Sequence, residues 1–338
     1  MNTIKALVLT ALLLTPLASW AGERNTATRL QEDFLTWKYG LFLHFNVGTF
    51  TDREWANGHE DPTAFAPEKL DCHQWAEVAA AAGMKYAVLT VKHTGGWCLW
   101  PSAHTRHGVQ SFARFREGKG DVVREFVDAF RARGLKVGFY YCFPGNYAGK
   151  YGNVLLPAQT DLHGLPPEAD GDYAGFIKKQ MTELLTQYGP IDLIWADQYG
   201  NSYTGKQWPE IKAHIKALQS NCLVIANNAH SFPTTDIHGY EYPALRGYPG
   251  KELPPAGNTN AAEVCDTITP GYWFWNNKSA ERPMLHAGDL AAMIEFANNR
   301  RANYLLNVPP DKTGRIPERF IVRLKEVSAL LGRKAEPK

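Results

Sequence analysis

The stretch Asp121–Phe143, DVVREFVDAFRARGLKVGFYYCF, contains the signals that decide the fold. Its first half, Val122–Arg133, is an amphipathic run, with Asp121 in front as a helix cap and Gly134 behind as a stop. Its second half, Lys136–Phe143, is mostly apolar without clean alternation, which is typical of a strand buried on both faces. A helix followed directly by such a strand indicates a parallel α/β fold.

The same alternation of strand and helix continues in both directions along the chain. Further strands are expected at Tyr39–Asn46, Tyr86–His93, Asp192–Gln198, Cys222–Asn228, Ala262–Thr267 and Tyr304–Val308. Further helices are expected at Cys72–Gly83, Tyr173–Tyr188, Trp208–Gln219, Leu290–Ala302 and Glu318–Leu331. No GxGxxG turn follows the first strand, so a closed (β/α)8 TIM-like barrel fits better than an open sheet. The segment Ser231–Asn260, rich in Pro, Gly and Tyr, is interpreted as a long loop.

The first 21 residues have the pattern of a secretory signal peptide. Lys5 precedes an apolar run, Ala6–Leu17, and Ala18–Ala21 offers small residues for cleavage after Ala21. We therefore predict a signal peptide at 1–21, a single catalytic domain at 22–338, and export to the periplasm or the medium. No later apolar run is long enough to span a bilayer, so we expect no membrane anchor.

Charge and cysteine usage exclude several classes of protein. The chain has 36 basic and 34 acidic residues, a net charge of +2 and no basic stripe, so we expect no nucleic-acid partner. Its five cysteines are an odd number, and none has zinc-ligand spacing. We therefore expect no metal, no cofactor and no disulfide framework, although a single bridge stays possible. The sequence does not indicate an oligomeric state.

Polar side chains gather where the expected strands end. Active sites of such barrels lie at the carboxyl ends of the strands. The residues there that can hydrogen-bond a polyol are His44, Lys92–His93, Tyr140–Tyr141, Asp197, Asn227–Asn228 and Glu263.

Asp197 and Glu263 are the candidates for a catalytic pair. Asp197 follows the apolar run Leu193–Ala196, where a carboxylate costs desolvation unless it is hydrogen-bonded or functional. The alternative is a structural aspartate that caps a loop. Glu263 lies within the run AAEVCDTI, and its alternative is an edge glutamate in a salt bridge. Two carboxylates on different strands of one barrel can act as the pair of a glycosidase.

At these positions the sequence resembles the α-L-fucosidases of glycoside hydrolase family 29. Val88–Ser102, VLTVKHTGGWCLWPS, is the most specific match and resembles the family's KHHDGFxLWxS segment. The other matching stretches are Trp37–Asn46 with Glu54–Trp55, Val137–Cys142, Ile191–Asp197, Ala262–Trp273 and Asn303–Pro317. All occur in the family's order.

The resemblance implies a retaining double displacement on a terminal α-L-fucosyl residue of an oligosaccharide or glycoconjugate. It implies Asp197 as the nucleophile and Glu263 as the general acid/base. Contacts to the sugar are expected from His44, Glu54, Trp55, His93 and Tyr141. Trp273, with Tyr272 and Trp275, is expected to form the subsite of the leaving group.

Some positions depart from the family pattern. Thr94 stands where the family has a second histidine, and Gly95 and Trp97 replace its Asp and Phe. An arginine that some members place after the fifth strand has no match near Asn228–His230, and the C-terminal β-sandwich of many members is not expected here. Two alternatives follow: the same barrel acting on a related sugar such as an α-L-galactoside, or a carbohydrate-binding pseudoenzyme.

Overall fold

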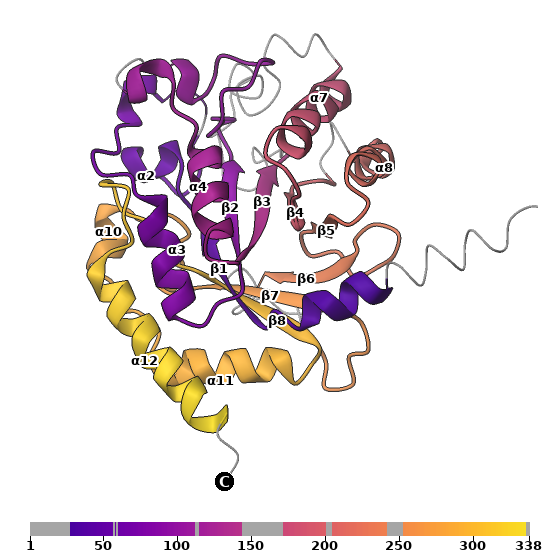
Figure 1. The fold of residues 1–338 in the computed structure, drawn as a ribbon, viewed down its shortest axis with the longest axis vertical. Helices are drawn as coiled ribbons and strands as arrows, with labels where there is room; N and C mark the ends of the chain where they lie inside the picture. Colours follow the sequence, from indigo (N-terminus) through magenta and orange to yellow (C-terminus); the bar gives the residue numbers. More distant parts are fainter. Residues whose placement is uncertain are drawn as a thin grey trace, which may run out of the picture.

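The computed structural model describes residues 28–56, 58, 60–111, 115–143, 172–200, 205–241 and 253–335; the predicted signal peptide lies outside this part of the chain. Eight parallel strands form a closed barrel in sequence order (Figure 1). The strands are β1 (Tyr39–Leu43), β2 (Tyr86–Lys92), β3 (Lys136–Cys142), β4 (Leu193–Asp197), β5 (Leu223–Ala226), β6 (Ile237–Glu241), β7 (Ala262–Thr267) and β8 (Ala302–Asn307). The predicted (β/α)8 class is confirmed.

Helices surround this barrel on its outside (Figure 1). The longer ones are α3 (Cys72–Ala81), α4 (Val122–Arg131), α7 (Tyr173–Thr186), α8 (Trp208–Leu218), α11 (Ala287–Asn298) and α12 (Glu318–Ala335), and two short ones are α2 (Val47–Thr51) and α10 (Asn277–Ala280). The cap signals read from the sequence act as predicted in α4. The Asp121 carboxylate accepts a hydrogen bond from Arg124 N at 2.8 Å, and Gly134 takes a left-handed φ of 68° just past the end.

Alternate residues of each strand enter two separate cores. One set, including Phe42, Tyr140 and Trp195, packs inside the barrel. The other set, including Tyr141 and Ile194, packs between the barrel and the helices. Because each large apolar side chain that leaves water contributes about 1.5–3 kcal/mol, both layers stabilise the closed barrel. The double burial explains why the strand segments lack a polar face.

The amino-terminal end of the barrel is plugged by large side chains. Residues 28–35 form a helix whose Phe34 enters the inner core, and the Phe34 carbonyl accepts a hydrogen bond from Asn303 Nδ2 at 2.7 Å. Gly40 leaves room for the Tyr86 ring, since a Cβ at position 40 would lie 2.3 Å from that ring. This end is therefore closed, and access to the interior comes from the carboxyl ends of the strands.

Two differences from the sequence predictions have a local explanation. The expected loop Ser231–Asn260 contains β6, whose sequence IHGYE has a single aliphatic residue and so shows no strand pattern. Helix α11 ends at Asn298 rather than Ala302, because the backbone turns left-handed at Arg301, φ 54°, and Ala302 already begins β8.

The cysteines and the helices of the described residues were also the subject of sequence predictions. All five cysteines are buried free thiols. Within residues 28–335, apart from the gaps given above, no helix combines the length and the hydropathy that crossing a membrane requires.

Candidate active site

Asp197 is the last residue of β4 and faces the carboxyl end of the barrel. Its Oδ2 accepts a hydrogen bond from the Tyr140 hydroxyl at 2.7 Å. Its Oδ1 accepts two more, from Asn227 Nδ2 at 2.9 Å and from Gln198 N at 2.9 Å. Burial raises the pKa of Asp197, and the three hydrogen bonds oppose that rise. The donors stabilise the ionised form of a desolvated carboxyl group, which is the form that a nucleophile needs.

A second carboxylate, Glu241, lies beside Asp197 and was missed by the sequence analysis. It is the last residue of β6. Its Oε2 accepts hydrogen bonds from Asn227 Nδ2 at 2.8 Å and from Asn228 Nδ2 at 3.3 Å. One amide nitrogen therefore binds both carboxylates. A barrel needs eight strands, so searching Ser231–Asn260 for the missing one would have exposed this glutamate at a strand end.

The position of Glu263 contradicts its predicted role as the acid/base. Glu263 is the second residue of β7 and pairs with Asn303, whose side chain accepts a hydrogen bond from Lys38 N just before β1. It therefore lies near the amino-terminal end of the barrel and is 2% exposed. Its oxygens accept hydrogen bonds from Tyr86 Oη at 2.6 Å and Trp195 Nε1 at 2.9 Å. Burial raises its pKa to about 7. Asp197, by contrast, is the last residue of β4, at the carboxyl end.

His44, which follows β1, is a neutral hydrogen-bonding group at the carboxyl end of the barrel. Asn307 Nδ2 donates to the Trp273 carbonyl at 2.7 Å, so Asn307 Oδ1 is left to accept from His44 Nδ1 at 2.7 Å. Burial, followed by the nearby His93, holds the pKa of His44 well below its usual value. His44 thus carries its proton on Nδ1 and has Nε2 as an acceptor for a hydroxyl group.

His93 lies next to His44, with ring centroids 5.4 Å apart. Its ring stacks on that of Tyr140 at 5.3 Å and 17°, and its Nδ1 lies 3.1 Å from the Thr94 hydroxyl. Thr94, the departure from the family pattern, therefore orients His93. Because Tyr140 donates to Asp197, this stack connects His93, a predicted sugar contact, to Asp197.

Glu54 and Trp273 are brought together from distant parts of the sequence. Glu54 Oε2 accepts hydrogen bonds from Trp273 N at 2.7 Å and Phe274 N at 3.2 Å, and Oε1 accepts one from Asn276 Nδ2 at 2.9 Å. Burial raises the pKa of Glu54 to about 7. The Trp273 ring then packs against His44 with centroids 4.8 Å apart. Trp55, the residue after Glu54, is 40% exposed. Tyr272 and Trp275, on either side of the Trp273–Phe274 pair, are half-buried.

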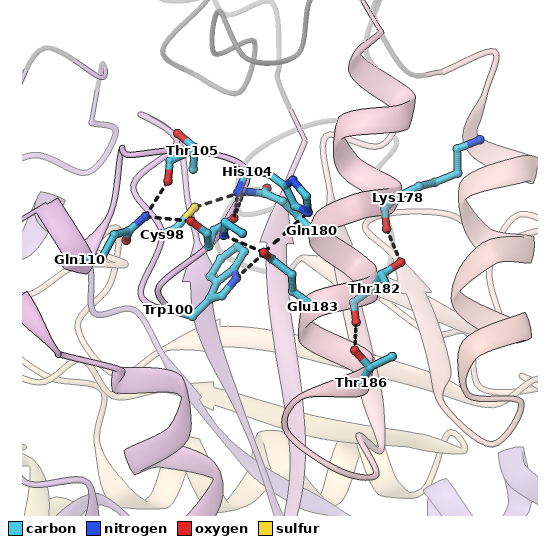
Figure 2. Close-up of polar contacts among 12 residues, drawn as sticks. Cys98, Trp100, His104, Thr105, Gln110, Lys178, Gln180, Thr182, Glu183 and Thr186 are labelled. Carbon is cyan, nitrogen blue, oxygen red and sulfur yellow. Dashed lines mark hydrogen bonds and ion pairs between the residues drawn. The ribbon is translucent and has the colours of Figure 1, made fainter.

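Tyr141 does not face the site, which corrects its predicted role in sugar binding. Its hydroxyl accepts a hydrogen bond from Lys92 Nζ at 2.9 Å and donates one to Gln180 Oε1 of α7 at 2.5 Å. Figure 2 shows Gln180 and Glu183 of α7 pointing toward the segment after β2, where Trp100 Nε1 donates to Glu183 at 2.9 Å. The preceding residue, Tyr140, takes the position beside Asp197.

Trp97, one of the departures that suggested a different sugar, belongs to the outer core. It is fully buried, and its ring lies near those of Phe65 and His107, at 6.0 and 5.2 Å. Among the residues that the structure describes, no group of three His, Cys, Asp or Glu side chains is arranged to hold a metal ion. The site thus offers two adjacent carboxylates with histidine and aromatic side chains around them.

Comparison with known proteins shows which family this chain matches. The family model described as Alpha-L-fucosidase matches residues 17–336. Alpha-L-fucosidase 1 of Arabidopsis thaliana is 30% identical over 330 residues, which cover 88% of this chain and 59% of that protein. The putative alpha-L-fucosidase 1 of Oryza sativa subsp. japonica is 33% identical over 314 residues, covering 86% of this chain and 56% of that protein. The chain thus spans between 56% and 59% of the length of these relatives.

Solved structures give the same result. Alpha-L-fucosidase isoenzyme 1 from Paenibacillus thiaminolyticus superposes with a TM-score of 0.72 at 26% identity, over 91% of this chain and 76% of that one. A putative alpha-L-fucosidase from Bacteroides ovatus also has a TM-score of 0.72, at 27% identity, over 92% of this chain and 57% of that one. With a closed barrel, a carboxylate pair at its open end and a family match over almost its full length, the chain belongs to the α-L-fucosidases of glycoside hydrolase family 29.

Proposed function

We propose that this chain is a retaining exo-glycosidase that removes terminal α-L-fucosyl residues from oligosaccharides or glycoconjugates, with Asp197 as nucleophile and Glu241 as general acid/base. The observation that supports the pair most strongly is the Asn227 amide nitrogen, 2.9 Å from Asp197 and 2.8 Å from Glu241. Two oxygens that bind one nitrogen lie close together, which supports the separation of about 5–5.5 Å between the carboxyl groups of retaining enzymes.

In the first step Asp197 attacks the anomeric carbon of the fucosyl group. The bond between that carbon and the glycosidic oxygen breaks, and its electron pair goes to the oxygen, which takes a proton from Glu241. Since Asp197 Oδ1 already accepts two N–H donors, Oδ2 is the oxygen with more freedom to attack. The products are a glycosyl ester of Asp197 and the free aglycone.

In the second step Glu241, now a carboxylate, takes a proton from water as the water oxygen attacks the anomeric carbon. The ester bond breaks, its electron pair returns to Asp197, and Glu241 is again protonated. The sum is hydrolysis with retention of configuration. Tyr140 Oη donates to Asp197 throughout and stabilises the departing carboxylate.

We assign the binding of the fucosyl group to the side chains that surround this pair. His44 and His93 offer hydrogen bonds to the hydroxyl groups, and the Trp273 ring beside His44 offers an apolar face. Glu54 acts through the turn that carries Trp273, and Trp55 lies next to Glu54 at the surface. Trp275 and Tyr272 remain our proposal for the subsite of the leaving group.

Hydrolysis of 4-nitrophenyl α-L-fucoside tests this function. We expect the wild-type protein to release nitrophenolate and Asp197→Ala to lose that release while remaining folded. The same assay with the α-L-galactoside measures sugar preference, and we expect the fucoside to react faster. A folded wild-type protein that binds fucose without hydrolysing the fucoside would instead establish a pseudoenzyme.

We also propose that the protein acts after export, in the periplasm or the medium. This proposal rests on the pattern of residues 1–21, with an apolar run followed by small residues before Ala21. Amino-terminal sequencing of the protein recovered from outside the cytoplasm should begin at Gly22.

A further inference from the structure

The backbone around Asn227 is held between two strands. Asn227 N donates to the Ala196 carbonyl at 2.9 Å, which extends the ladder between β5 and β4 by one residue. The next residue, Asn228, turns left-handed with φ 56°, and Gly239 of β6 lies so close that a Cβ there would be 3.3 Å from Asn228 N. The position of the Asn227 side chain is therefore determined by the barrel and not by a loose loop.

The side-chain amide of Asn227 occupies the space between the two carboxylates. Its Nδ2 lies 2.9 Å from Asp197 Oδ1 and 2.8 Å from Glu241 Oε2. An amide nitrogen has two hydrogens, so each carboxylate can receive one of them. The reverse orientation would place the amide oxygen against two carboxylate oxygens, which is repulsive whenever either is ionised.

The neighbouring donors are divided between the two carboxylates. Tyr140 Oη and Gln198 N donate to Asp197, and Asn228 Nδ2 donates to Glu241. The Asn227 side chain donates to both.

We propose that Asn227 is a positioning residue that sets the distance between the nucleophile and the acid/base, and that selects the Glu241 oxygen that delivers the proton. The proposal rests on the function proposed above. Glu241 Oε2 receives two amide hydrogens, and an oxygen that carries a proton is a weaker acceptor, so the amides favour the proton on Oε1. Asn227 also keeps Oδ1 of Asp197 occupied, which leaves Oδ2 for attack on the anomeric carbon.

Two substitutions of Asn227 distinguish the effect of its hydrogen-bond donation from the effect of its side-chain volume. Asn227→Asp keeps the size of the side chain and removes the amide hydrogens, whereas Asn227→Ala removes the side chain altogether. We expect both to lower kcat at neutral pH by at least about tenfold, because each removes the amide hydrogens that bind the two carboxylates. We expect Asn227→Asp to be the worse of the two, since it adds a third negative charge. Its activity relative to wild type should recover as the pH falls and the new carboxyl regains a proton.

The dependence of the rate on the leaving group gives the matched control. Asn228→Gly removes the amide that donates to Glu241 Oε2 and accepts from Glu241 N, leaves the hydrogen bonds of Asp197 in place, and suits the left-handed backbone at that position. It should slow substrates with poor leaving groups, which need protonation, and spare activated aryl fucosides. Asn227→Ala should slow both kinds, because it also releases Asp197. Thermal unfolding of each variant checks that the fold is retained.

The outcomes separate this proposal from the function on which it depends. If wild-type protein hydrolyses the fucoside but Asn227→Asp is as active as wild type, or clearly more active than Asn227→Ala at neutral pH, the amide fills space and the proposal fails. An Asn227→Ala variant slowed on poor leaving groups alone would also overturn it. If wild type has no activity on any fucoside, the proposed function fails first.

Discussion

At Glu263 a buried carboxyl group is satisfied in its protonated form as well as in its ionised form. Trp195 Nε1 can donate to one oxygen in both forms, while the Tyr86 hydroxyl can donate to the carboxylate or accept from the acid. The pKa of this group is raised from 4.5 to about 7 by burial. Glutamine reproduces the hydrogen bonds of the protonated acid, so it is a conservative replacement here.

We therefore expect Glu263→Gln to keep its activity on aryl fucosides and to change the pH dependence of stability. Between pH 4.5 and about 7 the folded wild type keeps a proton that the unfolded chain releases, so its free energy of unfolding falls as the pH rises through this window. The loss is at most roughly 3 kcal/mol, and Glu263→Gln should remove it. Urea unfolding at pH 5 and pH 8 measures the effect.

Glu241→Gln is the matched variant for Glu263→Gln, because it makes the same change at the proposed acid/base. It should lose activity on poor leaving groups, whereas Glu263→Gln should not. The opposite result, with Glu263→Gln inactive although folded and Glu241→Gln active, would show that Glu263 is the acid/base.

At the scale of elements, the end of β2 directs two neighbouring residues in opposite directions. A register shift between Thr90 and Lys92 places Lys92 opposite Tyr141, on the outer face of the sheet, while His93 stacks on Tyr140 in the site. Bulges of this kind re-aim side chains beside active sites. Lys92 is 1% exposed, and its ammonium group donates to the hydroxyls of Tyr141 and Tyr173 at 2.9 and 3.4 Å.

The buried charge of Lys92 should cost stability at neutral pH. Burial lowers the pKa of Lys92 from 10.5 to about 8, so below pH 8 the folded state holds a desolvated cation, and the cost disappears as the pH rises toward 10.5. We expect Lys92→Met to be as stable as wild type or more stable at pH 7, by up to roughly 3 kcal/mol, with a smaller difference at pH 9.5.

Lys136→Met, which removes an exposed lysine of β3, is the control in the same unfolding experiment. It should show no comparable change between pH 7 and pH 9.5. A Lys92→Met protein that is strongly destabilised at pH 7 would mean that the hydrogen bonds of the ammonium group outweigh its desolvation.

The elements also explain which site residues could be predicted from the sequence. Asp197, His44 and His93 follow apolar runs, so the position of each at a predicted strand end made it a candidate, and the structure places all three at the carboxyl end of the barrel. Because both faces of a barrel strand are apolar, no polar face in the sequence distinguishes Tyr140 from Tyr141, so the predicted sugar contact fell on Tyr141, which faces outward. The short strand β6 has one aliphatic residue, so Glu241 stayed hidden and the acid/base role passed to Glu263, the next carboxylate along the chain.

At the scale of the whole molecule, the two ends of the barrel have different tasks. The amino-terminal end is closed by Tyr86, Phe34 and Glu263, and the carboxyl end carries the proposed catalytic pair, Asp197 and Glu241. The class of fold could be predicted because caps, stops and doubly buried strands all indicate the same architecture. The meeting of Glu54 with Trp273 could not, because these residues are 219 positions apart and nothing local in either segment records the contact.

Because the closed amino-terminal end lies away from the proposed site, we expect a packing defect there to lower the free energy of unfolding and to leave the rate of hydrolysis unchanged. Gly40→Ala would place a Cβ 2.3 Å from the Tyr86 ring, and overpacking of this kind costs about 1–3 kcal/mol. Gly288→Ala, whose Cβ meets nothing within 4 Å, is the control and should be neutral or slightly stabilising. Urea unfolding gives the stabilities, and kcat per folded molecule should be unchanged in both. A lower kcat in folded Gly40→Ala would show that the two ends are coupled.

The most direct test of the central claim is to trap the glycosyl-enzyme. A 2-fluoro-substituted α-L-fucosyl fluoride slows both chemical steps, but its good leaving group favours the first, so a covalent intermediate accumulates. After peptic digestion, mass spectrometry should find one fucosyl-derived label on Asp197, and no label in Asp197→Ala. A label on Glu241 or on any other residue, or steady turnover of this reagent with an inverted product and no label, would contradict the account.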